Sequence, residues 1–139
     1  MLDPKIFQYA CRQLKFKPII DVFASKLHHQ LPHYFSRDKE DVYAYGIDAF
    51  SQDWSKENLY INPPFKQMNQ VVQKLVRERG RALVIAPVLP KQKWYQLLTR
   101  IAKRKIPLEG PIYLSWKGNL RPVPPFKTIA LVVDGRNNN

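Results

Sequence analysis

Four consecutive residues, Asn62-Pro63-Pro64-Phe65, have the types and spacing best suited to chemistry, and they follow the short apolar run Leu59-Tyr60-Ile61. Each proline fixes φ at about −65°, removes a backbone donor and keeps the preceding residue out of the α region. The Asn62 side chain and the Pro63 carbonyl are therefore expected to be rigid acceptors beside an aromatic ring. Such an arrangement suits binding of the amino group of a planar substrate.

The exocyclic amino groups of nucleic-acid bases are planar substrates of this kind. They are conjugated with the ring and are poor nucleophiles, so an enzyme that alkylates one should accept hydrogen bonds from both N–H bonds. Asn62 Oδ1 and the Pro63 carbonyl can accept them, and Phe65 can stack on a base taken out of its helix. The candidate catalytic residues are Asn62, Pro63, Pro64 and Phe65.

A structural alternative exists for the same residues, namely a Pro-Pro turn that enters the next helix with Phe65 in the core. Pro-Pro-Phe alone is not specific, because Pro124-Pro125-Phe126 repeats it. Val123 precedes that second copy, so no side-chain acceptor stands there. The asparagine and the preceding apolar run favour residues 62–65 as the site.

Two carboxylates, Asp21 and Asp48, are candidates for contact with a nucleotide-like ligand. An acidic residue at the carboxyl end of a strand often binds ribose hydroxyls or an adenine amino group. The alternatives are that Asp48 caps a turn and that Asp21 is a satisfied polar group at a strand end.

Metal and several other chemistries are disfavoured. His28, His29 and His33 lack the spacing of a zinc site, and Cys11 is the only cysteine. We expect no metal, and polyanion contact is the expected role of the histidine loop. The chain contains no Gly-x-Ser-x-Gly, no P-loop and no Gly-x-Gly-x-x-Gly, which disfavours a hydrolase, an NTPase and a dinucleotide dehydrogenase.

Apolar periodicity predicts alternating helices and strands, and hence an α/β fold with a mostly parallel sheet flanked by helices. In such folds ligands bind beyond the carboxyl ends of the strands. The residues expected there are Ala24-Ser25, Asp48, 62–65 and 87–90. We expect helices over 4–15, 66–78 (closed by Gly80) and 91–105, strands over 19–24, 42–47, 59–61, 81–87, 111–116 and 128–133, and a polar irregular segment over 25–40.

The charge of the chain indicates a polyanionic partner. It has 23 Lys and Arg against 11 Asp and Glu, a net charge of +12, and all of the excess lies in residues 66–139. Such a basic surface is typical of nucleic-acid binding, with membrane headgroups and an acidic protein as alternatives. A solvated helix face with Trp94 in the core is an alternative for the 91–105 segment. The candidate nucleic-acid-binding residues are Lys66, Lys91, Lys93, Trp94, Arg100, Lys103 and Arg104.

Length and hydropathy indicate one domain. A chain of 139 residues fits a single domain, expected over 1–136 with a disordered tail over 137–139. No apolar run approaches the roughly 20 residues of a membrane span, and Lys5 and Arg12 interrupt any signal-peptide core. We expect an intracellular protein, cytoplasmic or nuclear, with no membrane contact.

Several motifs occur together in a particular order, and their combination is more specific than any one of them. They are Asp21-Val22-Phe23-Ala24-Ser25, Tyr34-Phe35-Ser36, Asp48-Ala49-Phe50, Asp53-Trp54, Asn62-Pro63-Pro64-Phe65 and Val84-Ile85-Ala86-Pro87. Over roughly residues 5–105 the chain resembles the compact DNA N6-adenine methyltransferase (Dam-like) family of phages. It is most similar to the Dam-like domain that follows reverse transcriptase and RNase H in DIRS-type retroelements.

The resemblance implies a Rossmann-like methyltransferase sheet, S-adenosylmethionine as methyl donor and adenine N6 of DNA as acceptor. It puts residues 62–65 at the target amino group and Asp48 near the adenine of the cofactor. The cofactor-binding residues that it implies are Asp21, Phe23, Ala24, Ser25, Asp48, Ala49 and Phe50.

A second hypothesis belongs to a different class of protein. The turn after the first predicted strand is Ala24-Ser25 rather than a glycine-rich turn, which favours a catalytically inactive, methyltransferase-like nucleic-acid-binding module acting in retroelement replication. Such a module would associate with other retroelement proteins. The residues alone leave RNA, and even a protein glutamine, open as alternatives to DNA.

Overall fold

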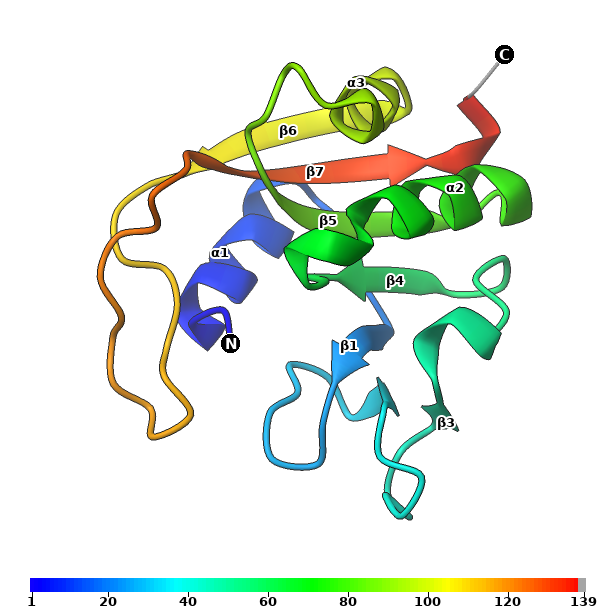
Figure 1. Ribbon diagram of the computed structural model, residues 1–139, viewed down its shortest axis with the longest axis vertical. Coiled ribbons are helices and arrows are strands. Elements are labelled where there is room, and N and C mark those ends of the chain that lie inside the picture. The colour runs from blue at the N-terminus through cyan, green and yellow to red at the C-terminus, as the bar shows by residue number, and fades with distance from the viewer. Residues whose placement is uncertain (138–139) are drawn as a thin grey trace.

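Seven strands lie in one mixed sheet, in the order β3-β2-β1-β4-β5-β7-β6, with helices on both faces (Figure 1). The computed structural model describes residues 1–137. In chain order the elements, with η for a 3-10 helix, are α1 (Pro4–Gln13), β1 (Ile20–Ala24), β2 (His33–Ser36), β3 (Gly46–Ile47), η1 (Ala49–Ser51), β4 (Asn58–Ile61), η2 (Phe65–Gln67), α2 (Met68–Glu78), β5 (Arg81–Pro87), α3 (Lys93–Arg100), β6 (Ala102–Leu108), β7 (Thr128–Asp134) and η3 (Gly135–Asn137).

Parallel pairing dominates the sheet. Strands β3, β2, β1, β4 and β5 pair in parallel, whereas β7 is antiparallel to both β5 and β6. The expected α/β fold with a mostly parallel sheet is therefore confirmed. The carboxyl ends of β1, β2 and β4 meet at one edge of the sheet, which is where parallel sheets bind ligands.

Side chains alternate between the two faces of the sheet, as the pleat of a strand requires. On β4, Leu59 and Ile61 pack under α2 and α3, whereas Tyr60 faces α1 and lies 4.7 Å from the ring of Phe7. Figure 1 shows α2 and α3 in front of the sheet and α1 behind it. Strands β5 and β7 are buried on both faces, which explains their continuous apolar sequences.

Local signals account for the helix ends. Asp3 caps α1 by accepting a 2.9 Å hydrogen bond from the Lys5 N–H. At the end of α2 the left-handed residue is Arg79 (φ 59°), not Gly80 as the pattern predicted. Gly80 is needed for space instead, because a Cβ there would lie 3.0 Å from the Trp54 carbonyl oxygen.

The helix predicted over 91–105 is wrong in its second half. Helix α3 ends at Arg100, and Ala102–Leu108 is the edge strand β6, which pairs only with β7. An edge strand tolerates charged residues and proline, because one of its sides is open to solvent. The charged residues Lys103, Arg104 and Lys105 therefore resembled the polar face of a helix, although they belong to β6. Pro107 is also compatible with an edge strand.

Three strand predictions also differ from the structure. Residues 33–36 lie inside the segment expected to be irregular, but they form β2. This run is short and has polar residues on both sides, so its sequence did not indicate a strand. The strand expected over 42–47 is reduced to Gly46–Ile47. Residues 111–116 make only isolated bridges, from Tyr113 to Leu2 and from Leu114 to Leu120, because β5 and β6 already occupy both sides of β7.

The chain end was expected to be a loose tail over 137–139. Asn137 belongs to the 3-10 helix η3, and residues 138–139 lie outside the described part of the chain.

Candidate functional site

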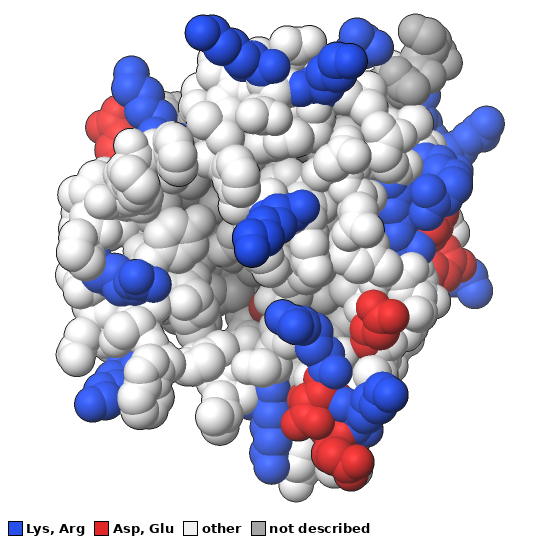
Figure 2. Space-filling model, viewed as in Figure 1, with Lys and Arg blue, Asp and Glu red and all other residues white. Residues whose placement is uncertain are grey.

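A cavity of about 630 Å³ lies at the carboxyl edge of β1, β2 and β4. Figure 2 shows the viewed face hollowed near its centre. Besides the strand ends, two residues of the long β6–β7 connection, Tyr113 and Arg121, line this cavity. The full lining is Met1, Val22, Phe23, Ala24, Ser25, His28, Phe35, Ser36, Arg37, Asp48, Ala49, Phe50, Asn62, Pro63, Pro64, Gln67, Tyr113 and Arg121.

The Asn-Pro-Pro segment forms one wall of the cavity through Asn62, Pro63 and Pro64. The Pro64 carbonyl closes a turn by accepting from the Gln67 N–H at 2.9 Å. The Pro63 carbonyl accepts no hydrogen bond from residues 1–137, so it remains available to a ligand. Two of the expected acceptors, Asn62 Oδ1 and the Pro63 carbonyl, thus belong to residues of the same cavity wall.

Two tyrosines flank Asn62. Burial raises the pKa of Tyr60 well above its ordinary value and also raises the pKa of Tyr113. In both cases the Asn62 side chain opposes the rise, as an amide N–H that faces a phenol oxygen does. Asn62 therefore lies close to both phenol groups.

Phe65 lies beside the cavity and is not among its lining residues. The ring is 51% exposed, so it is not the core residue of the structural alternative. It lies nearly parallel to Phe126 (6.4 Å between centroids, 12°) and edge-on to Trp94 (6.4 Å, 88°). The second Pro-Pro-Phe of the sequence is therefore placed against the first.

The two segments expected on the cofactor side line the same cavity. Phe23, Ala24 and Ser25 come from the end of β1, and Asp48, Ala49 and Phe50 from the start of η1. The rings of Phe23 and Phe50 pack edge to face at 5.5 Å. The segment over 87–90, also expected at this edge, is not part of the cavity lining.

Asp48 has a strained backbone, with φ 64° and ψ 101°. Its carboxylate accepts from the Phe50 N–H (3.2 Å) and from the Ser51 hydroxyl (2.8 Å), so it caps η1 as one of the two alternatives expected. A non-glycine residue in such a region costs about 1–3 kcal/mol and is typical of ligand sites. Asp48 both caps the turn and lines the cavity.

Asp21 lies on the α1 face of the sheet, away from the main cavity. It lines a smaller cavity of about 80 Å³ that shares Met1, Phe23, His28 and Asn62 with the larger one. Its carboxylate accepts from the Gln30 N–H at 2.8 Å. Burial raises the Asp21 pKa to about 6, although that hydrogen bond and His29 oppose the rise.

Gln67 is a site residue that the sequence did not reveal. It lines the cavity, and its Oε1 atom is buried without a hydrogen-bond partner among the described residues. A buried acceptor without a partner is costly, so a water or a ligand donor at the cavity would complete it. Ser36 and Arg37 were missed because β2 was missed, and no local pattern brings Tyr113 or Arg121 to this edge.

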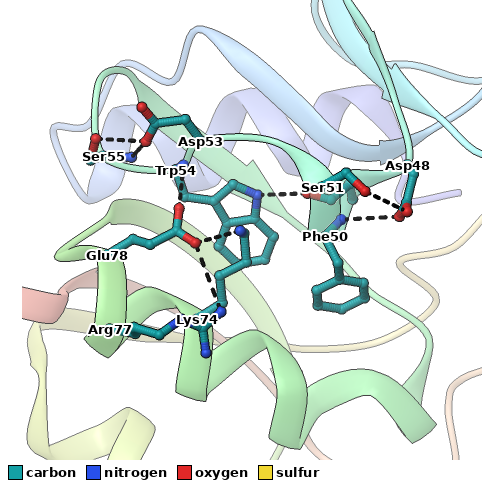
Figure 3. A network of polar contacts seen from close by, with 10 residues as sticks. Asp48, Phe50, Ser51, Asp53, Trp54, Ser55, Lys74, Arg77 and Glu78 are labelled. Carbon is teal, nitrogen blue, oxygen red and sulfur yellow. Dashed lines mark hydrogen bonds and ion pairs between the residues drawn. The ribbon is translucent and has the colours of Figure 1, made fainter.

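A polar network fixes the segment that carries Asp48, Ala49 and Phe50 to α2 (Figure 3). The indole N–H of Trp54 donates to the Ala49 carbonyl at 2.9 Å, and the Trp54 backbone N–H donates to Glu78 at 2.9 Å. Lys74 forms an ion pair with Glu78, and its ammonium lies 5.3 Å from the centroid of the Trp54 ring. The network holds one cavity wall in place.

The seven residues expected to contact nucleic acid do not form one helix face. Lys66, Lys91, Lys93 and Arg100 are exposed, but Trp94 is buried, as its structural alternative required. On β6, Lys103 forms an ion pair with Asp134 (3.4 Å), and Arg104 donates to the Leu14 carbonyl (2.8 Å). Most acidic side chains visible in Figure 2 lie toward the lower right of the view.

Among residues 1–137, no group of three or more His, Cys, Asp or Glu side chains is arranged to hold a metal ion. None of the helices in this part of the chain is both long and apolar enough to cross a membrane. Comparison with known proteins finds no family model and no curated protein that matches this sequence. The functional conclusion therefore depends on the geometry of the cavity.

Proposed function

We propose that this protein is an S-adenosylmethionine-dependent methyltransferase that acts on adenine N6 in DNA. One observation carries the proposal: a single cavity is lined both by Asn62, Pro63 and Pro64 and by the segments 23–25 and 48–50. An amino-group site and a nucleotide-like site in one cavity are what a transfer between two adenine-containing molecules requires.

The cavity suits such ligands in size and chemistry. A volume of about 630 Å³ lies within the usual range of about 300–1,000 Å³ for small-molecule sites. The Phe23 and Phe50 rings offer an apolar wall, while Ser25 and Asp48 offer polar contacts. The unpartnered Gln67 Oε1 would accept from an N–H of a bound ligand. The order of the strands is also consistent with a Rossmann-like methyltransferase sheet.

The residues of the chain would orient the reacting nitrogen. When bound, S-adenosylmethionine supplies a methyl group on a positively charged sulfur. Asn62 Oδ1 and the Pro63 carbonyl would accept the two N–H bonds of the target amino group, so that its lone pair faces the methyl carbon. The new N–C bond would form as the S–C bond breaks, and water would take the proton released from the nitrogen. No strong general base is required.

Substitution of Asn62 tests this role. Asn62→Ala should lower methyl transfer from labelled S-adenosylmethionine to DNA by at least about 100-fold, because one of the two orienting acceptors is lost. DNA affinity should change little, since phosphate contacts dominate it. Asn69→Ala, on the exposed surface of α2, is the matched control and should transfer at the wild-type rate.

Two results would contradict the role of Asn62. One is an Asn62→Ala protein that transfers methyl groups as fast as the wild type. The other is a large loss of DNA affinity in the same variant, which would make Asn62 a binding residue rather than an orienting one.

A second candidate function, an inactive nucleic-acid-binding module, is favoured by one feature of the turn after β1. The Ser25 N–H donates to the His28 carbonyl at 3.0 Å, so it is not free to bind a ligand carboxylate, and the turn contains no glycine. Such a module would bind nucleic acid and would not bind S-adenosylmethionine. The cofactor-binding measurement that closes the Discussion separates the two functions.

A further inference from the structure

The long connection between β6 and β7, residues 109–127, lies along the side of the molecule where the parallel strands end (Figure 1). We call it the arm. It is attached near its start, because the Met1 amino group donates to the Leu114 carbonyl at 2.9 Å and Tyr113 bridges to Leu2. It is attached again at its end, where the Val88 N–H donates to the Lys127 carbonyl at 2.7 Å. Tyr113 and Arg121 bring the arm to the cavity.

The arm carries large apolar side chains that face solvent. Trp116 is 76% exposed and Phe126 is 49% exposed, and Leu120 and Val123 are exposed as well. The Phe126 ring lies nearly parallel to the ring of Phe65. Phe65 directly follows Pro64, which lines the cavity. Exposed aromatic rings thus lie both on the arm and at the edge of the cavity.

The charged residues next to the exposed rings in sequence are lysines. Phe65 and Phe126 each have a lysine as a direct sequence neighbour, namely Lys66 and Lys127. The Lys117 ammonium lies 5.2 Å from the centroid of the Trp116 ring. The one acidic residue of the arm is Glu109 at its start, and no Asp or Glu occurs in 110–127. An acidic protein or peptide is one polyanion, but exposed rings beside lysines fit a polyanion that also has flat faces.

We propose that the arm, together with Phe65, binds an unpaired nucleic-acid strand on either side of the target base, so that the preferred substrate is single-stranded. Aromatic rings stack on bases of any sequence, and neighbouring lysines bind the phosphates between them. In a duplex the faces of the bases are covered by their neighbours, so rings held on a surface have nothing to stack on. This inference rests on the proposed function only in taking the adjoining cavity as the target-base site.

The test compares one labelled oligonucleotide of about 16 nucleotides as a single strand and as a duplex, by fluorescence anisotropy. The wild type should bind the single strand more tightly. Trp116→Ala and Phe126→Ala should each weaken single-strand binding by about 5- to 100-fold and duplex binding much less. Tyr43→Ala is the matched control, because Tyr43 is 68% exposed with the Lys26 ammonium 4.9 Å above its ring, and it should have no effect.

Preferential binding of the duplex by the wild type would overturn the proposal. So would arm variants that bind the single strand as the wild type does, or that lose both forms equally. Unchanged melting temperatures of the variants show that any loss is not a loss of folding. Failure of cofactor binding with the arm effect intact would refute only the methyltransferase. Cofactor binding without an arm effect would refute only this inference.

Discussion

Asp21 is a buried carboxyl group whose titration makes the stability of the fold depend on pH. Burial raises its pKa from 3.8 to about 6, so the folded protein keeps a proton that the unfolded chain releases near pH 4. The folded state therefore binds more protons between these values, and its stability falls as the pH rises from about 4 to 6. The size of the effect is about 3 kcal/mol.

Asp21→Asn should remove this dependence while keeping an acceptor for the Gln30 N–H. Urea denaturation at several pH values measures it. Variant and wild type should be similar in stability below pH 4, and the variant should become the more stable protein as the pH passes 6. A difference between them that stays constant from pH 4 to 7 would show that Asp21 is not buried as described.

At the same scale, the sequence predicted the position of Asn62, Pro63 and Pro64 at the carboxyl edge of the sheet better than the rest of the cavity lining. The prolines of 62–65 restrict the backbone locally, so their geometry follows from residue type alone. Gln67, Tyr113 and Arg121 reach the cavity only through tertiary structure, and no short pattern contains that information. Phe65 lies against Phe126, which is distant in sequence, so no local pattern predicts this contact.

Among the elements, α2 and the segment 48–56 depend on one buried lysine. Lys74 lies on the packed face of α2, and Glu78 balances its charge while accepting from the Trp54 N–H. Glu78→Gln should lower the free energy of unfolding by at least about 2 kcal/mol, because it leaves a buried cation without a counter-charge. Adding Lys74→Met to this variant should restore most of the loss.

Arg77→Ala is the control for this network, measured by the same urea denaturation. Arg77 is exposed, and its guanidinium lies 3.8 Å from the Glu78 carboxylate, which is a long contact for an ion pair. Its removal should therefore lower the free energy of unfolding by less than about 1 kcal/mol. Equal effects of Glu78→Gln and Arg77→Ala would mean that the ion pair with Lys74 does not stabilise the fold.

The elements also show why part of the fold was mispredicted. Helix α2 has apolar residues at helical spacing, strand β5 is a short continuous apolar run, and both were predicted. Edge strands lack such a constraint, because one side is open to solvent and tolerates lysine, arginine and proline. Strand β6 was therefore mistaken for a helix face. Strand β2 is not an edge strand, and it was missed because it has only four residues.

For the whole molecule, the cavity and the arm lie on the same side. The excess of 12 positive charges lies in the half of the chain that supplies α2, α3 and the arm. The carboxyl ends of the parallel strands, which form the cavity, open beside the arm. The α/β class could be predicted from sequence because alternation of helix and strand patterns specifies it, whereas the course of the arm could not.

The central claim is that the cavity binds S-adenosylmethionine, and isothermal titration calorimetry of the wild-type protein with this compound tests it most directly. We predict saturable binding at one site per chain, weakened by Phe50→Ala, which removes part of the cavity wall, and unchanged by Tyr43→Ala. Absence of binding at millimolar S-adenosylmethionine, in a protein that still binds nucleic acid, would contradict the claim and favour the inactive module.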